Sequence, residues 1–325
     1  MPATPPQADS EAIGRFFQTR EQETMFMKSK QTILSGFAVA VLASSLSICT
    51  LNARAADDFD ASTIAKDSAL ASRVPQDIAA KGVLSIGSDT TYPPAEFLAG
   101  EDGQTPEGID VDLAKAMAQT LGLKLEFVTA QFDSILPAIG PRYDLGISAF
   151  TITNERYKAV DFVSYFNAGK QWAIQSGNPA KFNPDEPCGK TVGVQTGSTG
   201  EKAVKGFSDN CVGAGKPAIE TVSMPKQTDL ITRLINGAVD AVYAGSTNIG
   251  YAVKQTNGQL ETIGAITYPS PNGIAVAKGQ TAWAQLVADT INGLIADGTY
   301  AKILAKWGIG SAAVAKAEVN PAVQE

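Results

Sequence analysis

The chain has 325 residues, 44% of them hydrophobic, and carries 26 basic and 33 acidic side chains but no histidine. A chain of this length and composition can bury a large core, and its length favours two domains. The absence of histidine excludes Ser-His-Asp and Cys-His catalysis and His-ligated metal sites. The acidic balance, with no basic run, argues against a nucleic-acid partner, because phosphate contacts need clustered Lys and Arg.

Residues 1–55 have the features of a secretory signal rather than of a folded domain. Two lysines precede the apolar run 33–42, and small residues at 53–55 offer a cleavage site. The polar stretch before Met25 is atypical of a signal and indicates an over-extended N-terminus. We therefore expect a periplasmic, secreted protein. A membrane anchor is the alternative, and lipoprotein anchoring through Cys49 is not expected.

After export the chain keeps two cysteines, Cys188 and Cys211. An oxidising compartment favours their pairing in a disulfide, with two free buried thiols as the alternative. Outside the signal, no apolar run approaches the ~20 residues needed to span a bilayer.

From residue 81 onward, short apolar runs alternate with amphipathic helical patterns, which is typical of βα units and a mostly parallel sheet. Asp110 is the expected N-cap of a helix that ends at Gly122. Residues 309–325 lack apolar periodicity, and we expect a disordered tail there. The expected strands are 82–87, 125–129, 143–150, 191–194, 239–243 and 273–277.

Open α/β sheets bind ligands at the carboxyl ends of their strands. The loops after Gly87, Phe150, Val194 and Tyr243 lie at such ends. Residues in these four loops are therefore candidates for a binding site before any relative is considered.

Several short motifs follow one another between residues 81 and 308. They are S-D-T-T-Y-P-P at 88–94 with Glu96-Phe97, G-I-D-V-D-L-A at 108–114, T-I-T-N-E-R at 151–156, V-D-F at 160–162, the stretch 189–197, and A-D-G-T-Y at 296–300 through Trp307. In this order they resemble the polar amino-acid-binding proteins of ABC importers, the bacterial extracellular solute-binding proteins of family 3.

The resemblance implies a two-lobed α/β fold, the type II periplasmic-binding-protein fold. Each lobe would hold a mostly parallel sheet flanked by helices, and two crossing strands would form the hinge. Lobe 1 would comprise residues 78–167 plus 268–308, and lobe 2 residues 168–267. The implied function is to capture a small polar amino acid or derivative, without cofactor, metal or catalysis, and to pass it to permease and ATPase subunits. We expect a monomer.

The resemblance also implies how the carboxylate of the ligand is held. Arg156 matches the arginine that grips it, and a guanidinium can do so through two parallel hydrogen bonds. Thr199, at the start of a helix, would offer its backbone N–H to the same carboxylate. Thr151 would contribute its hydroxyl and amide. The alternatives are a surface arginine and an ordinary strand-to-helix turn.

Four further positions match the rest of the family's binding site. Tyr92 and Phe132 match two aromatic walls around the aliphatic part of the ligand, although each could instead be a core or rim residue. Asp89 matches the position that meets the far end of the ligand side chain, with a solvated turn aspartate as the alternative. Ala149 matches a residue whose backbone carbonyl contacts the ammonium of the ligand.

Two positions depart from the family pattern. Gly245 stands where the family has the acid that pairs with the α-ammonium, and a buried ammonium without its counter-charge is costly. Ala95 stands where phenylalanine is common, which would widen the pocket. Either another acid substitutes, or the ligand keeps a carboxylate but is not a standard free α-amino acid; an opine-like or N-substituted compound is one possibility.

Two other functions remain open. One is an enzyme of the branch that resembles cyclohexadienyl dehydratase, with Asp89 or Glu96 as the acid. The other is a periplasmic sensing module that docks on a membrane receptor. Neither a carboxylate pair nor a nucleophile-base pair is evident in the sequence.

Overall fold

The computed structural model of the protein describes residues 59–323. The predicted signal segment, residues 1–55, therefore lies outside the described residues. The strands are β1 (Val83–Ser88), β2 (Thr91–Tyr92), β3 (Glu96–Ala99), β4 (Thr105–Glu107), β5 (Lys124–Thr129), β6 (Leu145–Thr151), β7 (Val160–Gln175), β8 (Thr191–Gln195), β9 (Glu220–Met224), β10 (Ala241–Gly245) and β11 (Leu260–Ala277). The helices are α1 (Ser68–Ala71), α2 (Gln76–Lys81), α3 (Ile109–Leu121), α4 (Phe132–Ile135), α5 (Thr199–Gly213), α6 (Gln227–Ile235), α7 (Ser246–Gln255), α8 (Thr281–Ala296) and α9 (Thr299–Lys306), with short 3-10 turns η1 (Ala61–Thr63), η2 (Leu136–Ala138), η3 (Arg156–Lys158) and η4 (Gly310–Ala312).

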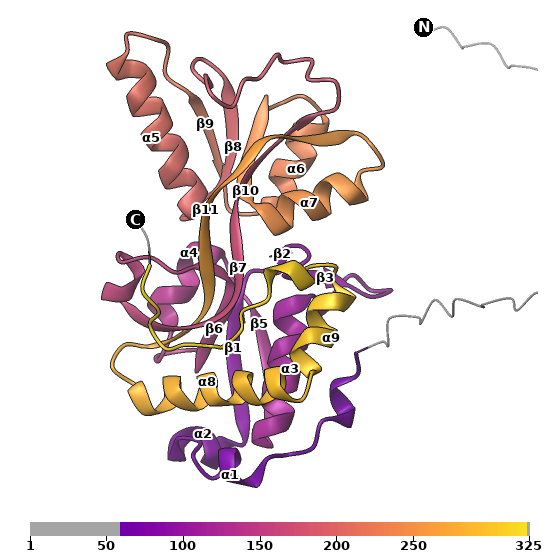
Figure 1. Cartoon of the computed structure of the whole chain (residues 1–325), viewed down its shortest axis with the longest axis vertical. Coiled ribbons are helices and arrows are strands. Elements are labelled where there is room, and N and C mark those ends of the chain that lie inside the picture. The colour runs from indigo at the N-terminus through magenta and orange to yellow at the C-terminus, as the bar shows by residue number, and fades with distance from the viewer. Residues whose placement is uncertain (1–58, 324–325) are drawn as a thin grey trace, which may run out of the picture. The chain divides into compact units, whose positions relative to one another are not determined.

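Eight strands form one sheet in the order β5-β1-β6-β11-β7-β10-β8-β9, and β2, β3 and β4 form a small second sheet. β1 pairs in parallel with β5 and β6, and β8 pairs in parallel with β9 and β10, so each end of the large sheet is built from parallel units. The long strands β7 and β11 are antiparallel and pass from one lobe to the other (Figure 1). The predicted two-lobed α/β fold is confirmed, and the predicted lobe boundaries fall within these two strands.

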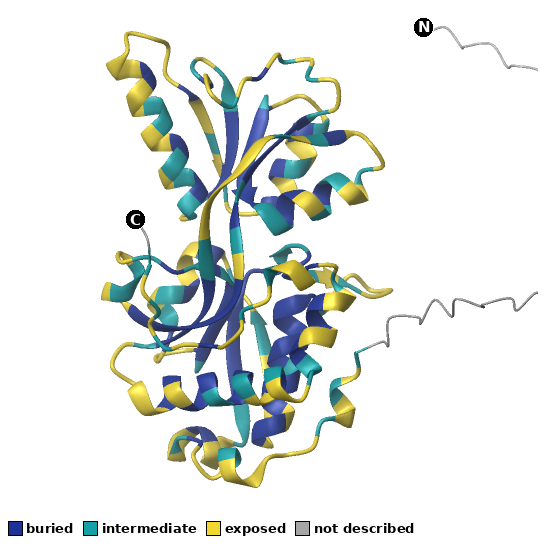
Figure 2. Cartoon of the chain, in the orientation of Figure 1, coloured by how far each residue is buried: buried dark blue, intermediate teal, exposed yellow. Residues whose placement is uncertain are grey.

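Each lobe has its own hydrophobic core. In the first lobe, Ile86 of β1 and Ile147 of β6 belong to the same cluster as Met117 of α3 and Val287 of α8. In the second lobe, one cluster includes Trp172, Val194 and Tyr243. Between the lobes, β11 is exposed over residues 264–269 (Figure 2). Two separately packed cores joined by two strands, one of them exposed at the crossing, favour hinge motion between the lobes.

Helix α3 begins differently from the sequence prediction. Gly108, not Asp110, is its N-cap, and Asp110 lies fully buried in the first turn. Its carboxylate instead accepts hydrogen bonds from the backbone N–H of Ala149 and the hydroxyl of Tyr165. The helix ends at Gly122 in the left-handed conformation, as predicted.

Residues 309–323, predicted to be disordered, instead pack against the first lobe. Ala313 forms a β-bridge with Phe166 and Val319 forms one with Val163, while Ala317 is only 1% exposed. In this lobe the edge of β7 is open to the tail, because β10 pairs with β7 only over residues 170–173. Periodicity failed as a guide here because bridging a strand edge requires backbone groups rather than an apolar repeat.

Cys188 and Cys211 form a disulfide with an S–S distance of 2.00 Å. The bond joins the loop before β8 to α5 in the second lobe. The predicted pairing is therefore confirmed.

Candidate functional site

The predicted site residues lie where the two lobes meet. Those of the first lobe are Asp89 after β1, Tyr92 in β2, Phe132 at the start of α4, Ala149 and Thr151 at the end of β6, and Arg156 in η3; those of the second lobe are Thr199 at the start of α5 and Gly245 at the end of β10. Strand ends supply most of them, as expected for an open α/β sheet.

Hydrogen bonds between the lobes bring these residues together. The backbone N–H of Gly245 donates to the hydroxyl of Tyr92 at 2.8 Å. Nε2 of Gln195 donates to Oδ2 of Asp89 at 2.6 Å. The hydroxyls of Thr199 and Thr151 are 3.4 Å apart. The structure therefore places the two sets of site residues in direct contact.

Arg156 is positioned by neutral groups. Its Nη1 donates to the backbone carbonyl of Thr151 at 2.8 Å and its Nη2 to that of Gly197 at 3.2 Å. The guanidinium carbon lies 5.4 Å from the ring centre of Phe132 and 5.6 Å from that of Phe150, within cation–π range. Burial lowers the pKa of Arg156 to about 10, so the group stays charged at neutral pH. No acid within residues 59–323 forms a salt bridge with it.

A second cation, Lys170 of β7, lies beside Arg156. Its Nζ donates to Oγ1 of Thr151 at 3.3 Å. Burial, together with the positive charge of Arg156, lowers the pKa of Lys170 to about 7. The described part of the chain provides no salt-bridge partner for this lysine either. Two basic side chains thus converge on Thr151, and neither forms a salt bridge within residues 59–323.

Asp89 is a buried acid that takes part in the interlobe contacts through Gln195. It is 2% exposed, and its Oδ1 accepts from the backbone N–H and the hydroxyl of Thr91. Burial raises the pKa of Asp89 to about 6, although the hydrogen bonds from Thr91 and Gln195 oppose this shift. The carboxylate of Asp89 is therefore held by hydrogen bonds from Thr91 of the first lobe and Gln195 of the second.

Glu96 and Asp110 form a buried acid pair behind the site. Oε1 of Glu96 accepts a hydrogen bond from the hydroxyl of Ser148 at 2.6 Å, whereas its Oε2 has no donor among the described residues. Burial and the charge of Asp110 raise the pKa of Glu96 well above its usual value, and burial raises that of Asp110 to about 6. A proton shared by the two acids satisfies the remaining oxygen.

This acid pair also fixes the backbone at Ala149. The N–H of Ala149 donates to Oδ2 of Asp110 at 3.0 Å, and Ala149 has a φ of 42°, which is uncommon outside glycine. Such backbone outliers cluster at functional sites. The structure therefore fixes the peptide whose carbonyl the resemblance assigns to the ligand.

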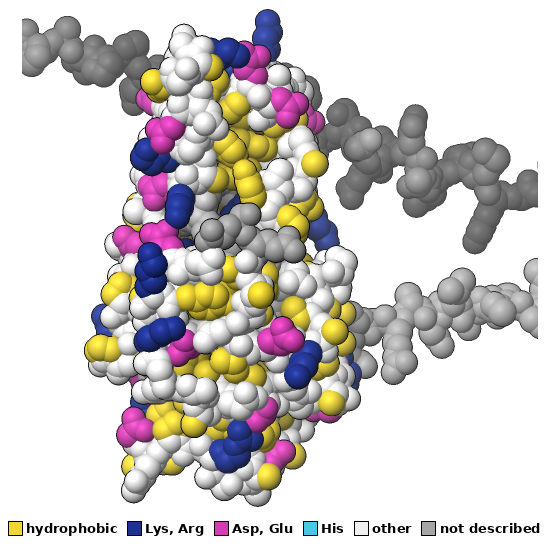
Figure 3. Space-filling view, turned by 60° about the vertical axis from the view of Figure 1, so that its left-hand side comes forward, with side chains coloured by type: hydrophobic (Ala, Val, Ile, Leu, Met, Phe, Trp, Pro, Cys, Tyr) yellow, Lys and Arg dark blue, Asp and Glu magenta, His cyan; other side chains and the backbone are white. Residues whose placement is uncertain are grey.

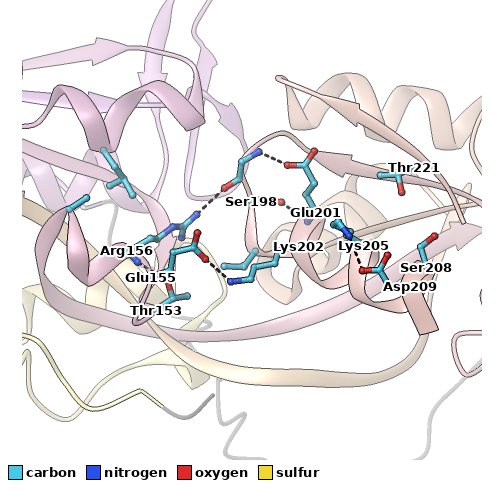
Figure 4. Close-up of a pocket in the computed structure, with 14 residues that line it drawn as sticks. Thr153, Glu155, Arg156, Ser198, Glu201, Lys202, Lys205, Ser208, Asp209 and Thr221 are labelled. Atoms are coloured by element: carbon cyan, nitrogen blue, oxygen red, sulfur yellow. Dashed lines mark hydrogen bonds and ion pairs between the residues drawn. The ribbon is translucent and has the colours of Figure 1, made fainter. Parts of the chain in front are cut away.

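A groove of about 810 Å³ opens beside the site (Figure 4). Arg156 and Thr199 line it, whereas Asp89, Tyr92 and Gly245 do not. An ion pair between Lys202 of α5 and Glu155, 2.5 Å long, joins its two sides. The groove therefore reaches the Arg156 side of the site and not the contacts of Tyr92 with Gly245 and of Asp89 with Gln195.

Sequence reasoning missed three residues at this interface. Gln195 ends β8, Asn248 lies in the first turn of α7 and donates to the backbone carbonyl of Pro93 at 2.7 Å, and Lys170 lies within β7. The first two lie in or just after the loops that follow Val194 and Tyr243, which were the available signal for them. The third lies close to the predicted lobe boundary at residues 167–168, which was the available signal for it. Residues 59–323 contain no group of His, Cys, Asp and Glu side chains that could hold a metal ion.

Comparison with known proteins gives a consistent result. Residues 84–310 match the model of the bacterial extracellular solute-binding proteins, family 3. The arginine-binding protein ArgT of Corynebacterium glutamicum is 33% identical over 249 residues, which cover 76% of this chain and 81% of that protein.

Solved structures agree with the sequence relatives. An ancestral arginine-binding protein bound to arginine is 36% identical with a TM-score of 0.64, covering 70% of this chain and 98% of the other. The ancestral amino acid-binding protein AncCDT-1, a precursor of cyclohexadienyl dehydratase, is 30% identical with a TM-score of 0.64, covering 71% and 97%.

Proposed function

Because the chain belongs to the bacterial extracellular solute-binding proteins of family 3, we propose that it captures an amino acid or amino-acid derivative between its lobes for an ABC importer. The observation that carries this proposal is Arg156, a charged guanidinium oriented by two backbone carbonyls and lacking a carboxylate partner among the described residues. A carboxylate of the ligand supplies that partner. The proposed recipients are permease and ATPase subunits.

The start of α5 supports the same contact. Thr199 opens this 15-residue helix, and its hydroxyl lies 3.4 Å from that of Thr151. The first N–H groups of a helix have no partner within the helix and favour an anion. The carboxylate would therefore join the lobes through Arg156 on one side and α5 on the other.

We propose further that the α-nitrogen of the ligand is not a free ammonium. Gly245 offers no acid to such a group, and its N–H is already bonded to Tyr92. An unpaired buried ammonium would lose its hydration without compensation. Arginine is the competing candidate, because relatives are named for it and the buried Asp89 could pair with a cationic side chain.

The arrangement of the three buried acids favours binding without catalysis. Asp89 and Asp110 accept several hydrogen bonds from the protein, and Glu96 lies fully buried behind the site. None of them is oriented as a free acid toward the groove. The relatives described above are binding proteins, including the dehydratase precursor.

The location and partners of the chain stay predictions. None of the helices within residues 59–323 is long and apolar enough to cross a membrane. On the face in Figure 3, Lys and Arg side chains are interspersed with Asp and Glu rather than gathered in one patch. The periplasmic location, the monomeric state and the absence of a lipid anchor are proposed from the sequence, and docking on a sensor instead of a permease is the alternative.

Calorimetry on the exported chain tests this proposal. The panel contains arginine, glutamine, N-substituted amino acids and carboxylic acids without nitrogen, and each is also measured with Arg156→Met. Binding that depends on Arg156 supports the proposal, because the ligand then contacts the folded protein through this side chain. Absence of binding by every carboxylate, or binding that Arg156→Met leaves unchanged, would overturn it.

A further inference from the structure

Lys170 stands directly opposite Gly245 in the large sheet. β7 and β10 are antiparallel, and the two residues are Cα partners in their register. Residues directly opposite one another on such strands project on the same face of the sheet. At the position where the family pattern places an acid, the residue paired across the two strands is therefore a lysine, which brings a basic group rather than an acid to this part of the sheet.

Lys170 forms no salt bridge within residues 59–323, and two acids of the site region, Glu155 and Asp89, are engaged with other groups. Glu155 pairs with Lys202 at 2.5 Å, and Asp89 accepts hydrogen bonds from Thr91 and Gln195. Within residues 59–323 the only hydrogen bond of the Lys170 ammonium goes to the hydroxyl of Thr151. This amine accordingly has donors left for a group that enters the cleft.

Arg156 and Lys170 share one anchoring residue. Thr151 accepts from Arg156 through its backbone carbonyl at 2.8 Å and from Lys170 through its hydroxyl at 3.3 Å. Two like charges brought together in a partly desolvated place repel one another. A ligand with one negative charge can compensate one of these cations, and a ligand with two can compensate both.

We infer that the ligand carries two carboxylates, one held by Arg156 and the second, attached through its α-nitrogen, held by Lys170 beside Gly245. The ligand class is an amino acid whose nitrogen bears a carboxyalkyl substituent. This inference rests on the proposed function, because it takes Arg156 as the first carboxylate site. It explains together the missing acid at Gly245 and the lysine opposite it.

The test compares three ligands by calorimetry on the exported chain: arginine, arginine with a carboxyethyl group on its α-nitrogen, and the same compound with that added carboxylate converted to an amide. A hydrogen bond to a charged group contributes about 1.5–3 kcal/mol, which corresponds to roughly 10- to 100-fold in affinity. The dicarboxylate should therefore bind at least ~10-fold more tightly than its amide. Lys170→Met should remove most of this difference, because the charged partner of the added carboxylate is then absent.

The variants separate this inference from the proposed function. If Arg156→Met weakens all three ligands but Lys170→Met weakens none selectively, the function stands and the second carboxylate site is wrong. If Lys170→Met weakens the dicarboxylate and the amide equally, Lys170 has only a structural role and the inference fails. If none of the three ligands binds, the inference fails, and the wider panel of carboxylates decides separately whether the proposed function stands.

Discussion

The hydroxyl of Tyr92 fills the space where a side chain on Gly245 would begin. It accepts the N–H of Gly245 at 2.8 Å, and a Cβ on this glycine would lie only 2.7 Å from the hydroxyl oxygen. Gly245 has φ −59° and ψ 137°, which other residues adopt without strain. The contact with Tyr92, and not the backbone conformation, therefore accounts for the glycine.

Restoring the acid should restore binding of ordinary amino acids. We expect the double variant Tyr92→Phe/Gly245→Asp, which removes the obstructing hydroxyl, to bind a standard α-amino acid such as arginine at least ~10-fold more tightly than Tyr92→Phe alone, because the new carboxylate pairs with the ammonium. Calorimetry measures this change. Tyr92→Phe/Gly245→Asn is the control of equal size, and equal affinities for the Asp and Asn variants would contradict the argument.

Arg156 should be needed for binding and dispensable for stability. Arg156→Met removes two charge-assisted hydrogen bonds to the ligand, so we expect a loss on the order of 100-fold in affinity. Arg156→Lys keeps a charge without the planar fork and should lose less. The melting temperature without ligand should stay the same or rise, because the described acids do not compensate this buried charge. A large fall in melting temperature would instead assign Arg156 a structural role.

Burial of three acids predicts how stability changes with pH. The folded-state pKa values of Asp89 and Asp110 are raised from 3.8 to about 6, and the pKa of Glu96 is raised well above its usual value. The folded protein thus holds these protons more tightly than the unfolded chain, and their contribution is complete below pH 3.8 and lost as pH rises through about 6. Asp161 has a lowered pKa and acts in the opposite direction, but only below pH 3.8. Lys170, with its pKa lowered to about 7, also opposes the trend, because it favours the folded state as pH rises through 7, but it is one group against three. We expect a higher urea midpoint at pH 5 than at pH 7.5.

Glu96→Gln checks whether the acid pair causes this dependence. A glutamine keeps the shape of the protonated acid, can accept from Ser148 and can donate to Asp110. The variant should fold with a near-normal midpoint and show a smaller difference between the two pH values. Glu96→Ala, which leaves a cavity and an unpaired hydroxyl, should lose stability at both. A pH dependence that Glu96→Gln leaves unchanged would exclude the pair as its source.

The position of the candidate site could be predicted from the sequence more fully than the contacts within it. Residues at strand ends, such as Arg156 and Thr199, could be found because the fold class dictates where strand ends meet. Lys170 could not, because its importance depends on the register that places it opposite Gly245. Asp110 resembled a helix cap by pattern, yet its burial against Ala149 depends on packing between β6 and α3. Pairing between distant strands is information that local patterns do not contain.

The disulfide should stabilise the second lobe locally. Cys188 and Cys211 are 23 residues apart. Closing a loop of this length lowers the conformational entropy of the unfolded chain, which stabilises the folded protein by about 3 kcal/mol in the chain-entropy model. The double variant Cys188→Ser/Cys211→Ser should unfold at a lower urea concentration. Its ligand affinity, measured below the unfolding transition, should be close to normal, because the bond is remote from Arg156. Equal midpoints for the variant and the oxidised protein would contradict this account.

Residues 310–322 should stabilise the first lobe, because they form hydrogen bonds with the edge of β7. Ser164 and Glu318 exchange two hydrogen bonds at 3.0 Å, and Asn320 exchanges two more with Phe162 of β7. Each such bond contributes about 1 kcal/mol net, so ending the chain after Ile309 should lower the free energy of unfolding by at least ~3 kcal/mol. Urea unfolding measures this, with a chain ending after Ala322 as the control that keeps these contacts. If the shorter chain is as stable as the control, the packing of residues 310–322 does not contribute to stability; if it is less stable but binds ligand with normal affinity at low temperature, the tail supports the lobe without taking part in the site.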